Sequence, residues 1–175
     1  MLTGLANLGL SLQEIGERSM NVTTFDNDTV SHDNLGRQPF FPCDIGRNKA
    51  IVLTERINMA YGMDWTATPS KIAMNSEIGK FDLIISCVDT AASRRTIGAL
   101  MKNSRRQNPA YWLDLGNRAT DGQIVLGQVA NTILSQPRLQ TVLELFPEIT
   151  QSDYVEDDQP SCSLAEALEK QSLFI

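Results

Sequence analysis

The nearly continuous apolar run from Phe81 to Val88, Phe-Asp-Leu-Ile-Ile-Ser-Cys-Val, is the feature that most constrains the fold of this chain. A strand with one face in water alternates apolar and polar residues, whereas a strand buried on both faces does not. Strands of the second kind are typical of parallel sheets that are covered by helices. The run therefore predicts the α/β class.

Segments with helical and strand patterns alternate along residues 1–129. Crossover helices between parallel strands produce this order, so we expect a Rossmann-like α/β fold with a mostly parallel sheet and flanking helices. Asp44 is the expected N-cap of the second helix. The expected helices are Leu2 to Ile15, Gly46 to Tyr61 and Thr90 to Arg106. The other expected strands are Val22 to Phe25, Asp64 to Thr68, Tyr111 to Leu115 and Gln123 to Val129.

Length and composition favour one domain. A chain of 175 residues with 42% hydrophobic residues can bury one sizeable core. Residues 1–129 would form a partial Rossmann-like domain. Residues 130–175 would add an extended crossover segment with little sheet and a helix from Ser163 to Phe174, as parts of the same domain.

Charge and cysteine usage exclude several classes of protein. A net charge of −6 argues against nucleic acid as the main partner, because phosphate binding needs a basic surface. No apolar run approaches the roughly 20 residues of a membrane span. Cys43, Cys87 and Cys162 are too scattered for a disulfide framework or a zinc pair, so a reducing cytoplasm is the expected compartment.

The segment from Asp26 to Lys49 concentrates groups that recognise nucleotides. Asp26 stands where a strand should end, which is the edge at which open α/β sheets bind ligands. A carboxylate there can accept hydrogen bonds from a ribose, although acids at strand ends are also common in turns. Asp28 is expected to hold the loop. The donors that could meet phosphates are Asn34, Arg37, Gln38 and Lys49.

A second acid, Asp89, follows the Phe81 to Val88 run. Because both acids come directly after predicted strands, we expect Asp26 and Asp89 to share one edge of the sheet. The plainer interpretation is that Asp89 caps the helix that follows. Both interpretations can hold together.

These motifs resemble the nucleotide-binding segment of the ThiF/MoeB/HesA and ubiquitin-activating-enzyme superfamily. The resemblance is closest to the branch known as the PRTRC system ThiF family, with Trp112 to Asn117 and Pro160 to Leu168 as further matching stretches. One position departs from the superfamily pattern, because Thr90 stands where Asn is usual. The matching motifs are Asp26-x-Asp28, Asn34-Leu-Gly-Arg37-Gln38, Gly46-x-x-Lys49 and Asp82-x-x-x-x-Cys87-x-Asp89.

The resemblance implies an ATP-dependent and Mg²⁺-dependent adenylation. The substrate would be the C-terminal carboxylate of a small ubiquitin-like or sulfur-carrier protein, and the full-length enzyme would be a homodimer. Asp89 would hold Mg²⁺ beside the nucleotide, and Arg94 matches the arginine that follows this acid in the superfamily. The implied nucleotide-binding residues are Asp26, Asp28, Asn34, Arg37, Gln38, Lys49, Asp89 and Thr90, with Arg37, Lys49 and Asp89 acting in the chemistry.

Cys162 lies in a segment, Gln-Pro-Ser-Cys-Ser-Leu-Ala, that is similar to the region around the thioester cysteine of ubiquitin-like-protein-activating enzymes. A following helix would favour its thiolate. The alternative is a free cysteine beside serines that cap a helix, and both interpretations stay open. Cys43 and Cys87 are expected to pack as small hydrophobic residues.

The superfamily carries a Gly-x-Gly-Gly-x-Gly turn before a helix like Leu2 to Ile15, and this sequence contains no such turn. We therefore expect a chain truncated at both ends, without the first strand and the Gly-rich turn, that binds ATP weakly or not at all. Two alternatives stay open. One is a non-catalytic relative that docks a partner, and the other is an NAD- or SAM-dependent Rossmann enzyme.

Overall fold

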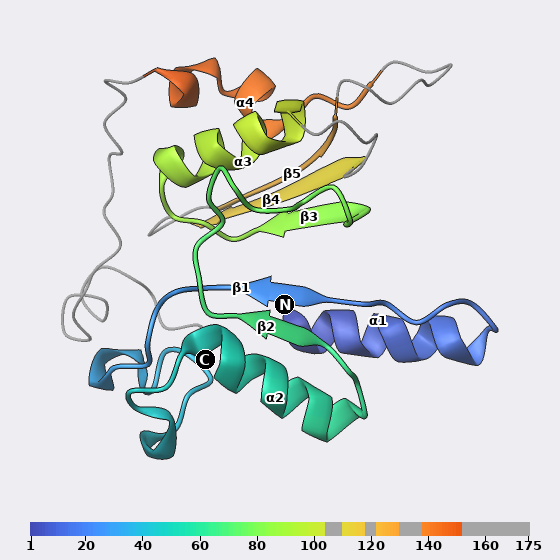
Figure 1. Cartoon of the computed structure of the whole chain (residues 1–175), viewed down its shortest axis with the longest axis vertical. Coiled ribbons are helices and arrows are strands. Elements are labelled where there is room, and N and C mark those ends of the chain that lie inside the picture. The colour runs from blue at the N-terminus through green and yellow to red at the C-terminus, as the bar shows by residue number, and fades with distance from the viewer. Residues whose placement is uncertain (104–109, 118–121, 130–137, 152–175) are drawn as a thin grey trace. The chain divides into compact units, whose positions relative to one another are not determined.

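The computed structural model describes residues 1–103, 110–117, 122–129 and 138–151 (Figure 1). The chain divides into two compact units, Met1–Lys71 and Ile72–Ile175. The predicted boundary near residue 129 stays a prediction.

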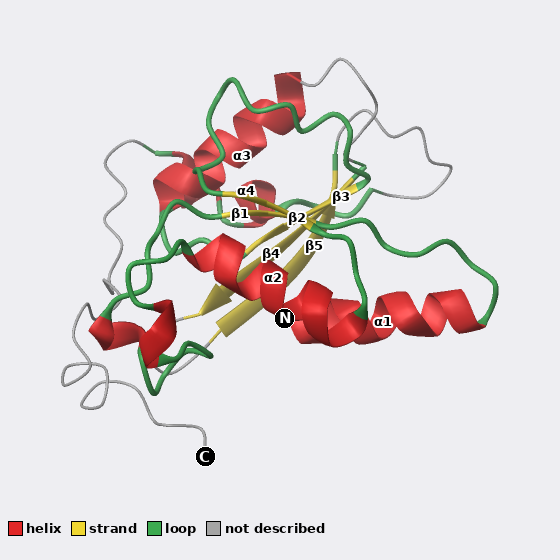
Figure 2. Cartoon of the chain, turned by 60° about the horizontal axis from the view of Figure 1, so that its bottom comes forward, coloured by secondary structure: helices red, strands yellow, loops and turns green. Residues whose placement is uncertain are grey.

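The first unit is built around a short parallel pair of strands. Strand β1 pairs with β2 in parallel, with Thr23 opposite Thr66. Helix α2 provides the crossover between them and lies beside the pair in both views (Figures 1 and 2). The elements of this unit are α1 (Leu2–Glu14), β1 (Thr23–Phe25), α2 (Lys49–Tyr61) and β2 (Thr66–Thr68). Two 3-10 turns, His32–Asn34 and Pro42–Asp44, lie between β1 and α2.

Two small apolar clusters hold the first unit together. In one cluster Ala6 of α1 packs with Ile57 of α2 and with Trp65, whose indole nitrogen donates to the Met20 carbonyl at 3.1 Å. The other cluster stabilises the loops that precede α2. It consists of Val30, Phe40 and Val52.

The second unit contains a three-stranded sheet with the order β3-β4-β5. The β3–β4 pairing is parallel and the β4–β5 pairing is antiparallel. Its elements are β3 (Leu83–Ser86), α3 (Ala91–Asn103), β4 (Tyr111–Asn117), β5 (Gly122–Gln128), α4 (Val142–Leu145) and a 3-10 turn at Pro147–Thr150.

Strand β3 differs from the expectation of burial on both faces. Ile84 and Ser86 are buried, but Leu83 on the other face is 39% exposed. The buried face joins the main core of the unit, where Ile84 and Trp112 pack with residues of α3 and α4. Within the described three-stranded sheet β3 pairs with β4, and the apolar run provides one well-covered face.

The α/β fold with parallel strands flanked by helices is confirmed, and the cap predicted for α2 is wrong. Asn48, and not Asp44, caps α2, because its side-chain oxygen accepts the Ile51 amide at 3.1 Å. The described residues 138–151 form short helical turns without a strand, while the predicted helix at Ser163 to Phe174 lies outside the described residues. No helix in the described ranges is long and apolar enough to cross a membrane.

Candidate functional site

The carboxylate of Asp26 lies at the carboxyl end of β1. Its backbone amide continues the strand pairing by donating to the Thr68 carbonyl at 3.3 Å. Its side-chain oxygen Oδ1 accepts the Asp28 amide at 2.8 Å, which closes a tight turn. The turn that the sequence analysis gave as the plainer role of Asp26 is thus present. It holds the half-buried Asp26 side chain at the strand end.

Lys49 meets this turn from the first position of α2. Its ammonium nitrogen lies 3.5 Å from Asp28 Oδ2, and its backbone amide donates to the Asp28 carbonyl at 2.9 Å. The Lys49 side chain is only 17% exposed, so its charge is held against the turn. The fold therefore brings together three of the predicted nucleotide-binding residues, Asp26, Asp28 and Lys49.

Asn34 is a structural part of the loop that the motif predicted. It is buried, and its side-chain oxygen accepts the Ser31 amide at 3.0 Å. Its carbonyl accepts the Gln38 amide at 3.0 Å, and Arg37 Nε donates to the Asp33 carbonyl at 2.9 Å. These bonds place Asn34, Arg37 and Gln38 on one compact turn, and phosphate contacts by them stay a prediction.

Asp44 has a role that the sequence analysis missed. Its buried carboxylate accepts the Phe41 amide and Arg56 Nη2, each at 2.8 Å. The backbone hydrogen bond from Phe41, followed by that from Arg56, lowers the pKa of Asp44. Arg56 also stacks over the Phe41 ring, 4.7 Å from its centroid. Asp44 therefore fastens the second 3-10 turn to α2. The only sequence signal for this role was an acid that directly follows Pro42 and Cys43.

In the second unit Asp89 is exposed in the loop after β3. Thr90, and not Asp89, caps α3, since its hydroxyl oxygen accepts the Ser93 amide at 3.2 Å. The capping interpretation of Asp89 is therefore wrong. Its predicted proximity to Asp26 concerns residues of two different units and stays a prediction.

Arg94, the superfamily match after Asp89, belongs to a buried ion pair. Its Nε lies 3.0 Å from Asp114 Oδ2, and both side chains are almost fully buried. Ser86 donates to Asp114 at 2.6 Å and in turn accepts the Trp112 indole N–H at 2.7 Å. This network ties α3 to β3 and β4, so Arg94 is a structural residue here. The sequence analysis passed over Asp114, although it is the one acid inside the apolar run of β4.

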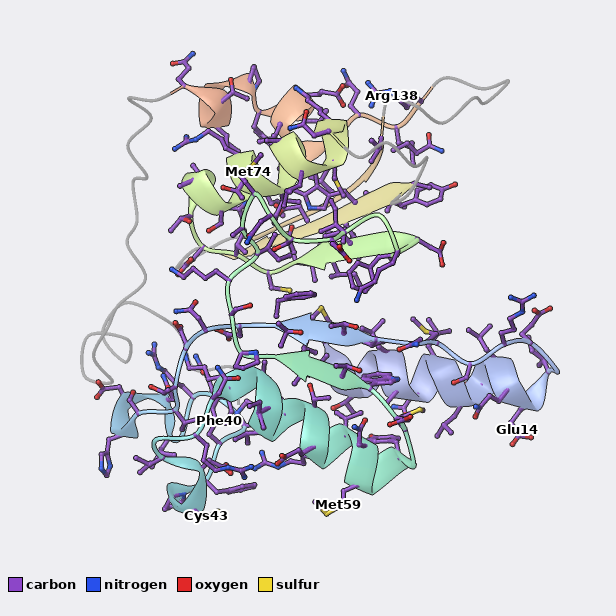
Figure 3. All side chains as sticks on the ribbon, in the orientation of Figure 1. Glu14, Phe40, Cys43, Met59, Met74 and Arg138 are labelled. Atoms are coloured by element: carbon purple, nitrogen blue, oxygen red, sulfur yellow. The ribbon has the colours of Figure 1, made fainter. Side chains whose placement is uncertain are left out.

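The expectation that Cys43 and Cys87 pack as hydrophobic residues is wrong, because both are exposed. Cys43 lies on the second 3-10 turn (Figure 3), and Cys87 directly follows Ser86, the last residue of β3. Partial burial of the sulfur raises the pKa of the Cys87 thiol. Cys162 lies outside the described residues.

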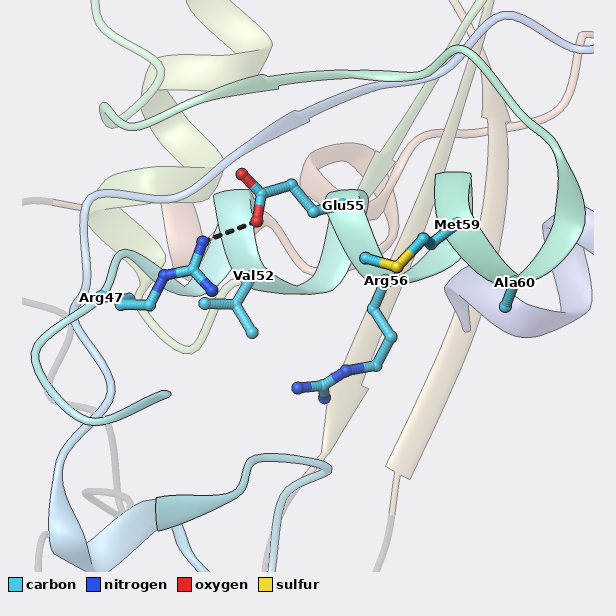
Figure 4. Close-up of a pocket in the computed structure, with 6 residues that line it drawn as sticks. All are labelled: Arg47, Val52, Glu55, Arg56, Met59 and Ala60. Carbon is cyan, nitrogen blue, oxygen red and sulfur yellow. Dashed lines mark hydrogen bonds and ion pairs between the residues drawn. The ribbon is translucent and has the colours of Figure 1, made fainter. Parts of the chain in front are cut away.

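An open hollow of about 300 Å³ runs along one face of α2 (Figure 4). Two of its lining residues, Arg47 and Glu55, form an exposed ion pair with a distance of 2.6 Å. None of the predicted nucleotide-binding residues borders the hollow, so its volume is no argument for the nucleotide site. Its lining residues are Arg47, Val52, Glu55, Arg56, Met59 and Ala60.

Fold and local geometry thus define an α/β protein with a carboxylate and a cation gathered at the end of its first strand. The family model described as "ThiF family" matches residues 1–166, and the chain belongs to the ThiF family. Members are in general adenylyltransferases for ubiquitin-like or sulfur-carrier proteins, and they typically use ATP, with Mg or Zn in some members. No curated protein matches the chain.

Proposed function

We propose that this protein adenylates the C-terminal carboxylate of a small ubiquitin-like or sulfur-carrier protein, with Mg·ATP as co-substrate. The cluster of Asp26, Asp28 and Lys49 is the observation that carries the proposal. A carboxylate at a strand end and an ammonium at a helix N-terminus are the two groups that a ribose and a phosphate require. Family membership supplies the reaction class.

Each residue of the cluster has a role in this proposal. Asp26 accepts hydrogen bonds from the ribose hydroxyls through its carboxylate. Lys49 donates to phosphate, and the positive end of the α2 dipole adds to its attraction for anions. Arg37 is the second phosphate donor, with a guanidinium that can bind two oxygens at once. Asn34 and Gln38 complete the loop.

Asp89 is the proposed Mg²⁺ ligand, because an exposed carboxylate after a strand suits an oxygen-preferring cation. Mg²⁺ supplies positive charge beside the phosphates when it is bound. Thr90 was predicted to contact the nucleotide. Its hydroxyl oxygen already accepts the Ser93 amide and caps α3, whereas the Asp89 carboxylate is exposed.

In the proposed reaction the C-terminal carboxylate of the small protein attacks the α-phosphorus of ATP, and pyrophosphate leaves with the electron pair of the broken P–O bond.

Finer assignments belong to the same proposal. Cys162 would attack the activated acyl group and form a thioester, releasing AMP. The PRTRC branch is the proposed position within the family, and a full-length homodimer in the cytoplasm is the proposed setting. A partner-docking relative without catalysis is the alternative, and the Thr90 departure from the superfamily pattern is the observation that favours it.

Titration with Mg·ATP, followed by NMR of the ¹⁵N-labelled protein up to millimolar nucleotide, tests the nucleotide site even if binding is weak. Amide shifts should concentrate between Asp26 and Lys49. Lys49→Ala should weaken binding by about tenfold or more, since a hydrogen bond to a charged group contributes roughly 1.5–3 kcal/mol.

Lys71→Ala is the matched control, because Lys71 is an exposed lysine in the same unit and should leave the affinity unchanged. An absence of nucleotide-induced shifts in the wild-type protein would contradict the proposed function. Unchanged affinity in Lys49→Ala would remove Lys49 from the site.

A further inference from the structure

One side chain, Asn48, joins the strand-end turn to the helix that carries Lys49. Its amide nitrogen Nδ2 donates to the Asp26 carbonyl at 2.9 Å and to the Asp28 carbonyl at 3.1 Å. Its oxygen Oδ1 accepts the Ile51 amide at 3.1 Å and so caps α2. Asn48 therefore uses both ends of its amide group, one for the turn and one for the helix.

The backbone supports the same connection. Asn48 and Thr29 form an antiparallel bridge, and the Lys49 amide donates to the Asp28 carbonyl at 2.9 Å. The Asp28 carbonyl thus accepts one bond from the Asn48 side chain and one from the Lys49 backbone. These contacts join residues about 20 positions apart in the sequence within a single unit of the fold.

The chemistry of the amide explains why asparagine stands at this position. Serine and aspartate cap helices about as well as asparagine, and threonine caps them somewhat less well. None of them offers the two N–H donors of an amide together with an acceptor oxygen. A helix cap alone would not require the amide, whereas the two bonds to the turn do.

We infer that Asn48 is a positioning residue, which sets the placement of the Lys49 ammonium relative to the Asp26 carboxylate. The inference rests on the proposed function, because it assigns these two groups to the phosphate and the ribose of one nucleotide. Without the Nδ2 bonds, the turn and the start of α2 keep only their backbone connection and the 3.5 Å ion pair of Lys49 with Asp28. The two binding groups then sample several separations, and the nucleotide must fix them on binding.

The chain offers a matched control at the other end of α2. Asn58 Nδ2 donates to the Trp65 carbonyl at 2.9 Å, and Asn58 Oδ1 accepts the Trp65 amide at 3.0 Å. Asn58 is thus another asparagine of α2 that fastens a neighbouring loop by its amide, and these two hydrogen bonds go to Trp65 and not to the Asp26 turn.

The experiment compares Asn48→Ser with Asn58→Ser in the Mg·ATP titration described above. Serine preserves the cap on Ile51 and introduces no charge, so Asn48→Ser removes the two bonds to the turn alone. The apparent dissociation constant should rise by about five- to tenfold in Asn48→Ser, as expected for lost hydrogen bonds, and stay within about twofold in Asn58→Ser. Without nucleotide, hydrogen exchange of the Lys49 amide should be faster in Asn48→Ser alone.

Equal dissociation constants for wild type and Asn48→Ser, or an equal rise in both variants, would overturn the positioning role. Unchanged exchange at Lys49 would overturn it as well, because the backbone connection would then suffice. If wild type binds nucleotide and Asn48→Ser binds equally well, the proposed function stands and this inference fails. If wild type shows no binding at all, both fail.

Discussion

At the scale of single residues, the side chains with the greatest structural consequence are two buried acids. Asp114 pairs with Arg94 inside the second unit, and Asp44 pairs with Arg56 in the first. Both acids are nearly inaccessible to water, so each must keep its partner to offset the cost of burial. The exposed pair of Arg47 and Glu55 carries no such requirement.

Removal of the Asp114 carboxylate should therefore be costly. Asp114→Ala leaves the Arg94 guanidinium buried without its counter-ion, and breaking a buried pair in this way typically costs about 3–5 kcal/mol. Chemical denaturation measures the free energy of unfolding. The matched control is Glu55→Ala, which breaks an exposed pair and should change stability by no more than about 1 kcal/mol. A similar small effect for both variants would contradict the structural role of this ion pair.

Glu144 should show a pH-dependent contribution to stability. Hydrogen bonding from Arg138, the largest cause, lowers the pKa of Glu144 to about 2 from the ordinary 4.5. Because the folded-state pKa is depressed, the stabilisation is complete above about 4.5 and is lost as the pH falls towards 2. An NMR pH titration of Arg138→Ala should show a raised Glu144 pKa, because the substitution removes the hydrogen bond that lowers it most. An unchanged pKa would contradict the assigned cause.

At the scale of elements, glycines mark where α4 and its neighbours approach other elements closely. A Cβ on Gly98 of α3 would meet the Leu143 side chain, and one on Gly127 of β5 would lie 2.5 Å from Thr141 Cα. A flexible side-chain end can move aside, whereas a backbone atom cannot move without displacing the start of α4. The close contact at β5 is therefore the stricter constraint.

Gly127→Ala should destabilise the protein more than Gly98→Ala, with an expected loss of about 1–3 kcal/mol or more from overpacking. Gly4→Ala provides the opposite expectation. Gly4 lies in α1 with no atom within 4 Å of an added Cβ, so alanine should stabilise the helix by up to about 1 kcal/mol. The melting temperatures of the three variants, measured by thermal unfolding, give the order of their stabilities. A larger loss for Gly98→Ala than for Gly127→Ala would contradict the argument.

At the scale of the whole molecule, the ThiF match covers the first unit and most of the second. The proposed nucleotide residues are divided between them, with Asp26 and Lys49 in the first unit and Asp89 in the second. The proposal assigns the ribose and phosphate contacts to residues of the first unit and the Mg²⁺ contact to a residue of the second. Metal dependence can separate these contributions, because only Asp89 is assigned to Mg²⁺.

Asp89→Asn should weaken Mg·ATP binding by about tenfold and leave metal-free ATP binding unchanged, because it removes one charged oxygen ligand of the cation. Asp26→Asn should weaken both, since a ribose contact needs no metal. Calorimetric titrations with and without a chelator distinguish the two patterns. Equal effects of Asp89→Asn under both conditions would contradict its assignment to Mg²⁺.

The sequence by itself determined the helices, the short strands and the presence of an acid at the end of β1, because helical and strand patterns and motif spacing are local properties. It also placed Lys49 in the first turn of a helix, although it expected that helix to begin at Gly46 and the structure begins it at Lys49. Only the tertiary structure decided which groups those residues meet. It paired Arg94 with Asp114 and Arg56 with Asp44, and it exposed one face of β3. Each of these outcomes depends on a partner 12 or more residues away or on which face a neighbouring element covers, and no local pattern encodes such a choice.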